Sequence, residues 1–356
     1  MTDPADRVSN APQRVVADGW FADIRGLLPL GEGHINDTLL VTDGSGDRFV
    51  LQRINDQVFR DPALVMNNLV RVIELLQSRA PGFIPALVST RHGEPAWVDE
   101  AGGWWRLWRY VEGTRARSST RDPAIARSAG EAFGRFQYLL QALPEPRLTP
   151  TIPGFLELTG YLEQLDRQLI GDLPGDVSSA VGNGAFIDSH RKLADRFPGG
   201  SDYLHGDCKL NNLLFQATGA EVAAVVDLDT VMCGHWAWDF GDLARSVLQG
   251  GGEMRSLFAA VVAGFALGSR RALDVEALLQ APVYVAFMLG VRFLTDHLAG
   301  DRYFKVNARG DNLRRAEQQF DLVRHLEGCA RTLHDAAVAG LREAEAIRLQ
   351  IRQDGK

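Results

Sequence analysis

Residues 203–212 read YLHGDCKLNN and place a single carboxylate, Asp207, five residues before an amide side chain, Asn212. This is the layout of a loop that catalyses phosphoryl transfer, in which an Asp accepts the proton of an acceptor hydroxyl and an Asn binds a magnesium ion. A second acidic cluster follows in residues 225–229, VVDLD, where Asp227 ends an apolar strand. The segment predicts Asp207 as the catalytic base and Asn212 and Asp227 as metal ligands. The alternative for the loop alone is a polar turn at a helix start.

Other side chains near the loop have two interpretations each. Lys209 could reach the γ-phosphate as a point charge, or it is a surface lysine. His205 could brace the loop by hydrogen bonding or act as the base, and we expect bracing because Asp207 occupies the position with a matching metal partner. Asp239-Phe240-Gly241 spells the metal-binding triplet of protein kinases, but it lies thirty-two residues after Asp207. We therefore assign the metal to Asp227, and we expect Asp239 and Asp242 to brace the loop from a helix start.

The composition bounds the class of protein. The chain has 356 residues, 46% of them hydrophobic, and a net charge of −7, so we expect a full core, a small-molecule substrate and no nucleic-acid or membrane partner. Three cysteines without a pattern argue against a disulfide framework and a structural zinc site. With no visible secretory signal, these features predict a cytoplasmic protein. The oligomeric state is left open between monomer and homodimer.

Two lobes are expected. Residues 1–14 are polar and predicted to be mobile, residues 15–111 to form a β-rich lobe that binds nucleotide, and residues 112–356 to form a mainly helical lobe with the catalytic loop and the acceptor site. Asp43 to Asp47, DGSGD, suits a tight hairpin turn, and Asp61-Pro62 suits a helix start. Strands are predicted at 24–30, 38–42, 48–54, 86–90 and 104–111. Helices are predicted at 61–78, 123–142, 155–169, 186–196, 238–248, 253–267, 275–298 with a break near Pro282, and 310–348.

Residues 30–38, LGEGHINDT, lie between two predicted strands. Glycine lets a backbone approach phosphates closely, so Gly31 and Gly33 are candidates for nucleotide binding. His34, Asn36 and Asp37 would then line a substrate or phosphate site. The alternative is an ordinary hairpin, in which Asn36 and Asp37 serve as turn residues.

The third strand reads FVLQRI over residues 49–54 and has no lysine, although protein kinases hold the nucleotide phosphates with a lysine there. Strand alternation puts Val50 and Gln52 on one face and Arg53 on the other. Gln52 fits by register and Arg53 by charge, and both remain candidates.

Residues 104–113, WWRLWRYVEG, suggest a strand that leads into a hinge. Backbone groups of Tyr110, Val111 and Glu112 would there bind the edge of an adenine. The alternative is an aromatic core strand.

These motifs resemble the aminoglycoside phosphotransferase and choline kinase superfamily, whose catalytic loop reads His-Gly-Asp with an Asn five residues after the Asp. The resemblance runs from Gly31 to about Glu327. It implies an α+β, two-lobed protein-kinase-like fold that uses ATP and Mg²⁺, with Asp207 as base and Asn212 and Asp227 as metal ligands.

Four phrases resemble the N-acetylhexosamine 1-kinases within that superfamily. They are GHINDT at 33–38, VLQRIN at 50–55, VDLDTVM at 226–232, and RFLTDHL at 292–298 with GDRYF at 300–304. The resemblance implies phosphorylation of the anomeric hydroxyl of an amino-sugar. The candidate substrate residues in these phrases are Asp229, Arg292, Asp296 and Tyr303, with Asp301 beside them. Arg292 and Asp296 could instead form an ion pair one helical turn apart.

Two alternatives to a sugar kinase remain. The first is a kinase of another small alcohol, such as homoserine, choline, methylthioribose or an aminoglycoside. The second is a catalytically silent kinase fold used for binding, which the missing lysine favours and the presence of Asp207, Asn212 and Asp227 disfavours.

Overall fold

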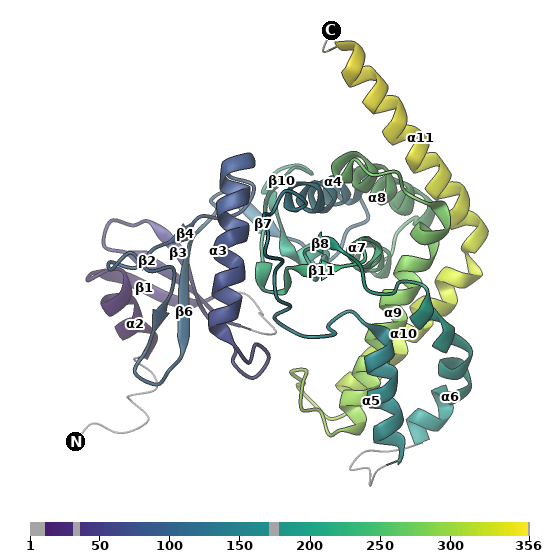
Figure 1. Ribbon diagram of the computed structural model, residues 1–356, viewed down its shortest axis with the longest axis horizontal. Coiled ribbons are helices and arrows are strands. Elements are labelled where there is room, and N and C mark those ends of the chain that lie inside the picture. The colour runs from purple at the N-terminus through teal and green to yellow at the C-terminus, as the bar shows by residue number, and fades with distance from the viewer. Residues whose placement is uncertain (1–10, 31–35, 171–177, 355–356) are drawn as a thin grey trace. The chain divides into compact units, whose positions relative to one another are not determined.

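The computed structural model describes residues 11–30, 36–170 and 178–354 (Figure 1). The chain divides into two compact units, Met1–Gly113 and Thr114–Lys356, two residues from the boundary predicted after residue 111. The first unit is built on a sheet and the second on helices. The predicted α+β class is therefore confirmed.

The N-terminal unit contains a twisted antiparallel sheet. Its strand order is β1 (Ile24–Pro29), β2 (Asp37–Asp43), β3 (Arg48–Arg53), β6 (Trp104–Arg109) and β4 (Leu87–Val88), and β5 (Trp97–Val98) also pairs with β6. The sequence predicted every strand except β5, which is only two residues long. The turn between β2 and β3 forms as expected, because Asp43 Oδ1 accepts the backbone N–H groups of Ser45, Gly46 and Asp47 at 2.9–3.0 Å.

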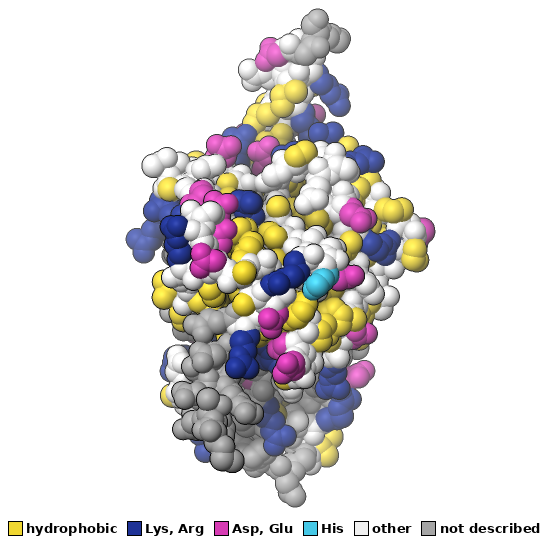
Figure 2. Space-filling view, turned by 90° about the vertical axis from the view of Figure 1, so that its left-hand side faces the viewer, with side chains coloured by type: hydrophobic (Ala, Val, Ile, Leu, Met, Phe, Trp, Pro, Cys, Tyr) yellow, Lys and Arg dark blue, Asp and Glu magenta, His cyan; other side chains and the backbone are white. Residues whose placement is uncertain are grey.

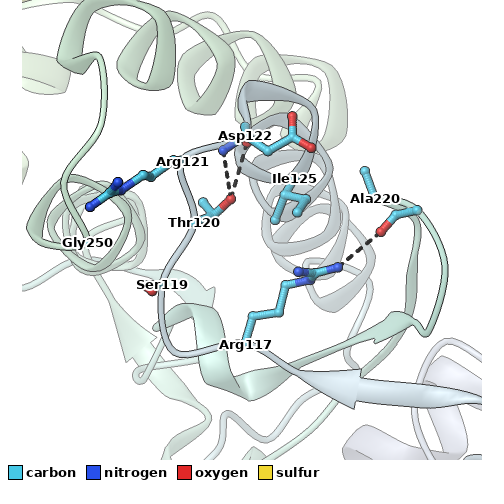
Figure 3. A pocket seen from close by; sticks show the side chains of 9 residues that line it. Arg117, Ser119, Thr120, Arg121, Asp122, Ile125, Ala220 and Gly250 are labelled. Carbon is cyan, nitrogen blue, oxygen red and sulfur yellow. Dashed lines mark hydrogen bonds between the residues drawn. The ribbon is translucent and has the colours of Figure 1, made fainter.

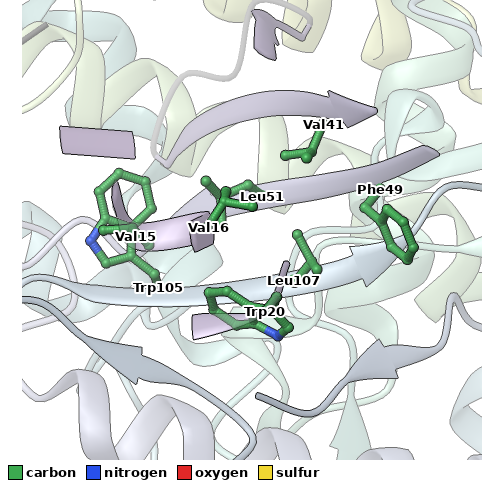
Figure 4. Packing of buried hydrophobic residues seen from close by; sticks show 8 residues of the cluster. All are labelled: Val15, Val16, Trp20, Val41, Phe49, Leu51, Trp105 and Leu107. Atoms are coloured by element: carbon green, nitrogen blue, oxygen red, sulfur yellow. The ribbon is translucent and has the colours of Figure 1, made fainter. Parts of the chain in front are cut away.

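One face of this sheet is covered by α2 (Ala11–Gly19). Figure 4 shows the resulting core, in which the helix and the residue that follows it meet the apolar side chains of three strands, β2, β3 and β6. The members are Val15, Val16, Trp20, Val41, Phe49, Leu51, Trp105 and Leu107. The prediction of a mobile segment up to residue 14 is therefore wrong for residues 11–14, which begin this helix.

Helix α3 (Pro62–Arg79) follows the third strand. Asp61 Oδ1 accepts the N–H of Leu64 at 3.0 Å, and Pro62 occupies the first turn. The sequence predicted both features. An Asp at the start of a helix accepts a free backbone N–H, and proline is tolerated in the first turn because it lacks an N–H that would have no partner there.

The C-terminal unit is mainly helical, with two small antiparallel sheets. Its sheets are β7 (Thr114–Ala116), β9 (Leu213–Gln216) and β10 (Val222–Val225) in the order β10-β9-β7, and β8 (Asp202–Leu204) with β11 (Met232–Gly234). Its helices are α4 (Pro123–Leu140), α5 (Leu158–Ile170), α6 (Ser178–His190), α7 (Ala237–Gln249), α8 (Met254–Ser269), α9 (Val275–Leu298), α10 (Asp311–Gly328) and α11 (Ala330–Asp354).

Three helix predictions are wrong in this unit. The helix expected at 186–196 ends at His190 and is followed by a 3-10 turn, Arg191–Asp195. Pro282 lies inside α9 without ending it, because packing of the surrounding buried side chains offsets the one backbone hydrogen bond that proline removes. The single helix expected at 310–348 is two helices, because the chain turns at Cys329 directly after Gly328.

Helix α9 is long and apolar enough to cross a membrane by length and composition alone. However, 72% of its apolar window is buried inside the protein, which is the behaviour of a core helix. On the face in Figure 2, Lys and Arg side chains are interspersed with Asp and Glu.

Glycines allow α4 and α8 to pack backbone against backbone. A Cβ added at Gly264 would lie 2.0 Å from the carbonyl oxygen of Arg127, and one at Gly130 would lie 2.5 Å from that of Val261. Only a residue without a side chain fits at these contacts.

Candidate active site

The predicted catalytic loop connects β8 to β9 in the C-terminal unit. Strands β9 and β10 are antiparallel neighbours, so the start of β9 and the end of β10 lie at the same edge. The N–H of Val226 donates to the carbonyl of Asn212 at 3.0 Å, which fixes this edge. The structure thereby brings Asn212 and the turn at Asp227 together, as the sequence predicted.

Asp239 holds the start of the loop from the first turn of α7. Its carboxylate accepts the backbone N–H groups of His205 and Gly206, each at 2.9 Å, and the side-chain amide of Gln137 at 2.8 Å. Burial raises the pKa of this carboxyl, and the donors act against that rise. The predicted bracing role of Asp239 is confirmed. Asp242 differs from the prediction, because its hydrogen bonds go to Arg245 one turn further along α7.

His205 and Gly206 fix the conformation that the loop needs. The Nε2 of His205 bonds to the carbonyl of Val226 at 3.0 Å, and its Nδ1 accepts the N–H of Asp207 at 3.3 Å. Gly206 has φ +82°, and a Cβ there would lie 2.5 Å from the carbonyl oxygen of Thr230. The predicted bracing role of His205 is confirmed.

Asp207 presents one carboxylate oxygen that is held and one that is not. Its Oδ2 forms an ion pair with the Nζ of Lys209 at 2.9 Å and accepts a hydrogen bond from the Nδ2 of Asn212 at 2.8 Å. Its Oδ1 accepts no hydrogen bond from the residues that the structure describes, and the side chain is 18% exposed. An oriented carboxylate with one available oxygen is suited to accept the proton of a substrate hydroxyl.

The charges around Asp207 keep it ionised. Burial alone would raise the pKa of this carboxyl, but the charge and hydrogen bond of Lys209, with the amide of Asn212, bring the pKa below its ordinary value. Burial would likewise lower the pKa of Lys209, and the charges of Asp207 and Asp227 raise it overall. The two groups therefore form a partly buried ion pair at neutral pH. Lys209 contacts the predicted base and is not a solvated surface lysine.

Cys208 lies between these two side chains in the sequence but is fully buried. Burial raises the pKa of its thiol well above the ordinary value, so it stays protonated. It is a packing residue of the loop.

The amide of Asn212 is oriented for a cation. Its Nδ2 donates to both the carbonyl and the Oδ2 of Asp207, at 2.8 Å each, so its Oδ1 is the end left over. That oxygen accepts no hydrogen bond within the described part of the chain. Amide and carboxylate oxygens are the protein ligands that Mg²⁺ takes, usually one or two of them, with phosphates and waters completing the shell.

Asp227 lies two residues after the end of β10 and has a left-handed conformation, φ 65° and ψ 60°. Such a backbone is unusual for a residue other than glycine and recurs at functional sites. Among the described residues, no group of three or more His, Cys, Asp or Glu side chains could hold a metal by itself. Asn212 and Asp227 therefore fit a magnesium ion whose other ligands come from a phosphate substrate. Asp229, two residues on, is only 2% exposed, and its substrate role stays a prediction.

The N-terminal candidates are engaged within their own sheet. Gln52 Oε1 accepts the Nε of Arg106 at 3.0 Å and the Nε1 of Trp108 at 2.9 Å, whereas Arg53 approaches Asp56 at 4.0 Å on the surface. The N–H of Tyr110 donates to the carbonyl of Arg48 at 3.1 Å, so this predicted hinge donor already has a partner.

The remaining nucleotide and substrate candidates of this unit are near residues 31–37. Asn36 Oδ1 accepts the N–H of Asn55 at 3.0 Å, which favours the turn interpretation of that side chain. Asp37 opens β2 and is exposed. Gly31, Gly33 and His34 lie outside the described residues, and their roles stay predictions, as does that of Val111.

Arg292 of α9 is surrounded by aromatic rings. Its guanidinium carbon lies within 6 Å of four ring centroids. The residue is buried, with 8% of its surface exposed. The rings are Phe155 at 4.9 Å, Tyr161 at 4.8 Å, Tyr303 at 5.7 Å and Phe304 at 5.4 Å. We call this group the Arg292 cage. Of its members the sequence singled out only Arg292 and Tyr303.

Arg292 has no ionic partner among the described residues. Asp296, one turn further along α9, does not pair with it, so the predicted alternative of an Arg292–Asp296 ion pair is wrong. The carboxylate of Asp296 instead accepts the backbone N–H groups of Arg302, Tyr303 and Phe304 at 2.8–2.9 Å. Asp296 thus shapes the loop that carries two rings of the cage.

Asn312 completes this support, and the sequence analysis missed it. Its Nδ2 donates to Asp296 Oδ2 at 2.9 Å and to Asp301 Oδ1 at 2.8 Å, and its side chain is fully buried. Asp301 has φ 56°, so it sits in a strained turn that this bond stabilises. The only available signal was its position at the start of a helix, next to Asp311.

A separate pocket of about 950 Å³ lies at the start of α4 (Figure 3). In that view Arg117 reaches the carbonyl of Gly219, at 3.3 Å, whereas Arg121 points away from it. Asp122 caps the helix by accepting the N–H of Ala124 at 2.9 Å. None of the predicted site residues lines this pocket.

The C-terminal unit thus carries the loop of a kinase-type phosphotransferase, with a positioned carboxylate and an amide oxygen for a metal. The chain belongs to the phosphotransferase enzyme family, whose sequence model matches residues 26–273. It is therefore an enzyme that transfers a phosphoryl group to an alcohol acceptor.

Solved structures show the same fold at low sequence identity. An amicoumacin kinase in complex with AMP-PNP and Ca²⁺ is 14% identical with a TM-score of 0.60, and the match covers 94% of each chain. A choline/ethanolamine kinase family protein from Mesorhizobium loti is 21% identical with a TM-score of 0.58, covering 93% of this chain and 99% of that one. A microcompartment-associated aminopropanol kinase is 17% identical with a TM-score of 0.58, covering 93% and 98%. These similarities confirm the predicted protein-kinase-like fold.

Proposed function

We propose that this enzyme transfers the γ-phosphoryl group of ATP, with Mg²⁺, to the anomeric hydroxyl of an N-acetylhexosamine. The family membership supports phosphoryl transfer to a small alcohol, and the amicoumacin kinase structure with AMP-PNP and Ca²⁺ supports a nucleotide and a divalent cation. The observation that carries the choice of acceptor is the Arg292 cage, because it favours an uncharged acceptor over a cationic one.

In this proposal, Asp207 and the residues around it have different chemical roles. Asp207 Oδ1 would accept the proton of the acceptor hydroxyl as the oxygen begins to bond to phosphorus. Lys209 keeps Asp207 ionised and supplies a positive charge beside the transferring group. Asn212 and Asp227 would hold Mg²⁺, which offsets the negative charge on the phosphates when bound.

Aromatic rings that converge on one point are the usual means of binding a quaternary ammonium or another cationic ligand. Here four rings converge on the protein's own guanidinium, so the place of such a cation is already taken. Burial raises the pKa of Tyr161, against the charge of Arg292, so this neighbour stays neutral and provides no counter-charge. A second cation near Arg292 would be repelled, which disfavours choline and aminoglycosides as acceptors.

Arg292 offers what a sugar needs. Its guanidinium forms no hydrogen bond with the described residues, so its N–H donors are available to hydroxyl or acetamido oxygens. The surrounding rings provide an apolar wall for the pyranose face. This side chain is therefore a donor in an apolar setting, as expected of a site for a neutral polar ligand.

The cage is tied to the metal-binding turn through one short segment. Thr151 Oγ1 donates to the carbonyl of Asp229 at 2.7 Å, and Phe155, four residues later, contributes a ring to the cage. Four residues span at most about 14 Å, so the segment connects the cage to the turn after Asp227 over a distance suited to a monosaccharide and its phosphate.

An acceptor panel tests the proposal. We expect Mg²⁺-dependent ADP release with N-acetylglucosamine or N-acetylgalactosamine, and little with choline, ethanolamine or kanamycin. NMR of the product should locate the phosphate on the anomeric oxygen. Turnover on cationic acceptors only would overturn the proposed acceptor.

A variant pair connects the specificity to the cage. Arg292→Met removes the charge but keeps an apolar chain, and we expect it to raise the KM for the sugar at least about tenfold, the value of one or two lost hydrogen bonds from a charged donor. The matched control is Arg302→Met, an exposed arginine in the adjoining loop. Equal effects of the two substitutions would contradict a role for the cage in acceptor binding.

A further inference from the structure

The catalytic loop has a second support from α7, which none of the motifs in the sequence indicated. The backbone N–H of Leu210 donates to the hydroxyl Oγ of Ser246 at 3.0 Å. Ser246 follows Asp239 by seven residues, about two helical turns, so the two side chains lie on the same side of α7. Asp239 therefore holds the start of the loop, and Ser246 holds the part that leads into Asn212.

Ser246 supplies an acceptor that the loop does not provide. Residues Leu210–Asn212 form a 3-10 turn, and the first N–H groups of a helical turn have no partner within that turn. The preceding residue, Lys209, makes no capping hydrogen bond, because lysine has no acceptor atom and its Nζ is paired with Asp207. The hydroxyl of Ser246 therefore takes the place of the capping side chain.

The hydrogen bond lies in the interior. Leu210 is fully buried, so its N–H has no direct access to solvent. A serine inside a helix often bonds to the backbone of its own helix, whereas the hydroxyl of Ser246 accepts from the catalytic loop. Without this hydroxyl the N–H of Leu210 would have no acceptor among the described residues, and a buried N–H without an acceptor is costly.

The turn that Ser246 holds also sets the position of Asn212. The N–H of Asn212 donates to the carbonyl of Lys209 at 2.9 Å, which closes the turn. The Nδ2 of Asn212 then reaches the carbonyl and the Oδ2 of Asp207. The direction of the Asn212 side chain therefore depends on a turn whose first N–H is bound to α7.

Asp242 was expected to give this second support. It lies on α7 between Asp239 and Ser246, but its carboxylate accepts its hydrogen bonds from Arg245 of the same helix. A serine four residues further along the helix takes that place. A serine in the middle of an amphipathic helix carries no sequence signal for such a role.

Resting on the magnesium site proposed above at Asn212 and Asp227, we propose that Ser246 is a positioning residue for that site. Its hydroxyl holds the turn that presents the Oδ1 of Asn212, and it acts through the backbone of Leu210 without being a metal ligand. Asp227 belongs to the turn after β10 and stays in place when Ser246 is changed. Loss of the hydroxyl should therefore weaken the metal site without abolishing it.

The coupling between Mg²⁺ and nucleotide tests the inference without relying on turnover. We measure the affinity for AMP-PNP by calorimetry with Mg²⁺ and with a chelator, and take the factor by which Mg²⁺ raises that affinity. We expect Ser246→Ala to lower this factor at least about fivefold, the effect of one buried N–H left without an acceptor. The affinity measured with the chelator should change less than about twofold. Ser246→Thr keeps the hydroxyl and should retain the wild-type factor.

Ser78→Ala is the matched control, because Ser78 lies in α3 and its hydroxyl donates to the carbonyl of Leu75 at 2.8 Å. We expect it to keep the wild-type factor. An unchanged factor in Ser246→Ala, or an equal loss of affinity with and without Mg²⁺, would overturn the inference. So would equal losses in Ser246→Ala and Ser246→Thr, because the hydroxyl would then have no part in the effect.

The wild-type enzyme separates this inference from the function on which it rests. If Mg²⁺ did not raise the affinity of the wild type for AMP-PNP, the proposed magnesium site itself would be wrong, and the role of Ser246 would be wrong with it. If Mg²⁺ raised the affinity equally in the wild type and in Ser246→Ala, the magnesium site would stand and only the role of Ser246 would be wrong.

Discussion

At the scale of single residues, the site depends on the different surroundings of the two carboxylate oxygens of Asp207. One oxygen of Asp207 is held by Lys209 and Asn212, and the other is left for a substrate. The same amide that orients Asp207 keeps its own oxygen free of hydrogen bonds within the described residues, and we propose that this oxygen binds the metal. Under that proposal, the base and one metal ligand are held together by the hydrogen bonds between Asn212 and Asp207.

Removing the charge of Lys209 should shift the acid limb of the pH profile. Burial raises the pKa of Asp207, and Lys209 is the group that lowers it most. In Lys209→Met that opposing effect is lost, so the pKa of the Asp207 carboxyl rises. We expect the acid limb of kcat/KM to move to higher pH, measured against the wild type with the same acceptor. An acid limb at the same pH in both enzymes would contradict the pairing.

The sign of the stability effect follows from the same pair. Because the folded-state pKa of Asp207 is depressed, its contribution to stability is present above the unfolded-state pKa and is lost as the pH falls through the folded-state value. Because the folded-state pKa of Lys209 is raised, the contribution of Lys209 to stability is lost only as the pH rises through that folded-state pKa. The loop should therefore be intact across the neutral range.

At the scale of elements, the helical unit is held by close contact of α4 with α8. Gly264 approaches the carbonyl of Arg127 so closely that a methyl group cannot be accommodated without moving one helix. Gln137, which supports Asp239, projects from the same helix α4. The packing of α4 on α8 therefore helps to position the catalytic loop, through Gln137 and Asp239.

Gly264→Ala should lower the free energy of unfolding by about 3 kcal/mol, the upper end of the usual overpacking cost. The control is Gly160→Ala in α5, where nothing lies within 4 Å of the added Cβ and the helix should gain up to about 1 kcal/mol. Denaturant unfolding of both variants checks the pair. If Gly264→Ala were as stable as the wild type, the close packing of α4 and α8 would be wrong.

Local sequence signals predicted the elements whose causes are local. The Asp43 turn, the Asp61-Pro62 helix start and the spacing from Asp207 to Asn212 all act over a few residues. The continuity of α9 through Pro282 could not be predicted this way, because packing by distant residues decides it.

At the scale of the whole molecule, the sequence predicted two units, the catalytic loop and an amino-sugar acceptor, but not the aromatic rings that surround Arg292. Phe155 and Tyr161 precede Arg292 by more than 130 residues, and no local pattern links an aromatic residue there to an arginine on α9. The same holds for Gln52 and Arg106, which only the strand register brings together. Long-range pairings of this kind cannot be found from local sequence patterns.

The most direct test of the central claim is a comparison of Asp207→Asn with the wild type in two assays, phosphoryl transfer and MgATP binding. The substitution keeps the shape of the side chain and removes the base. We expect kcat to fall at least about 10²-fold, the usual contribution of a general base, while the Kd for MgATP changes by less than about twofold. Turnover at the wild-type rate in Asp207→Asn would contradict the assignment of Asp207 as the catalytic base.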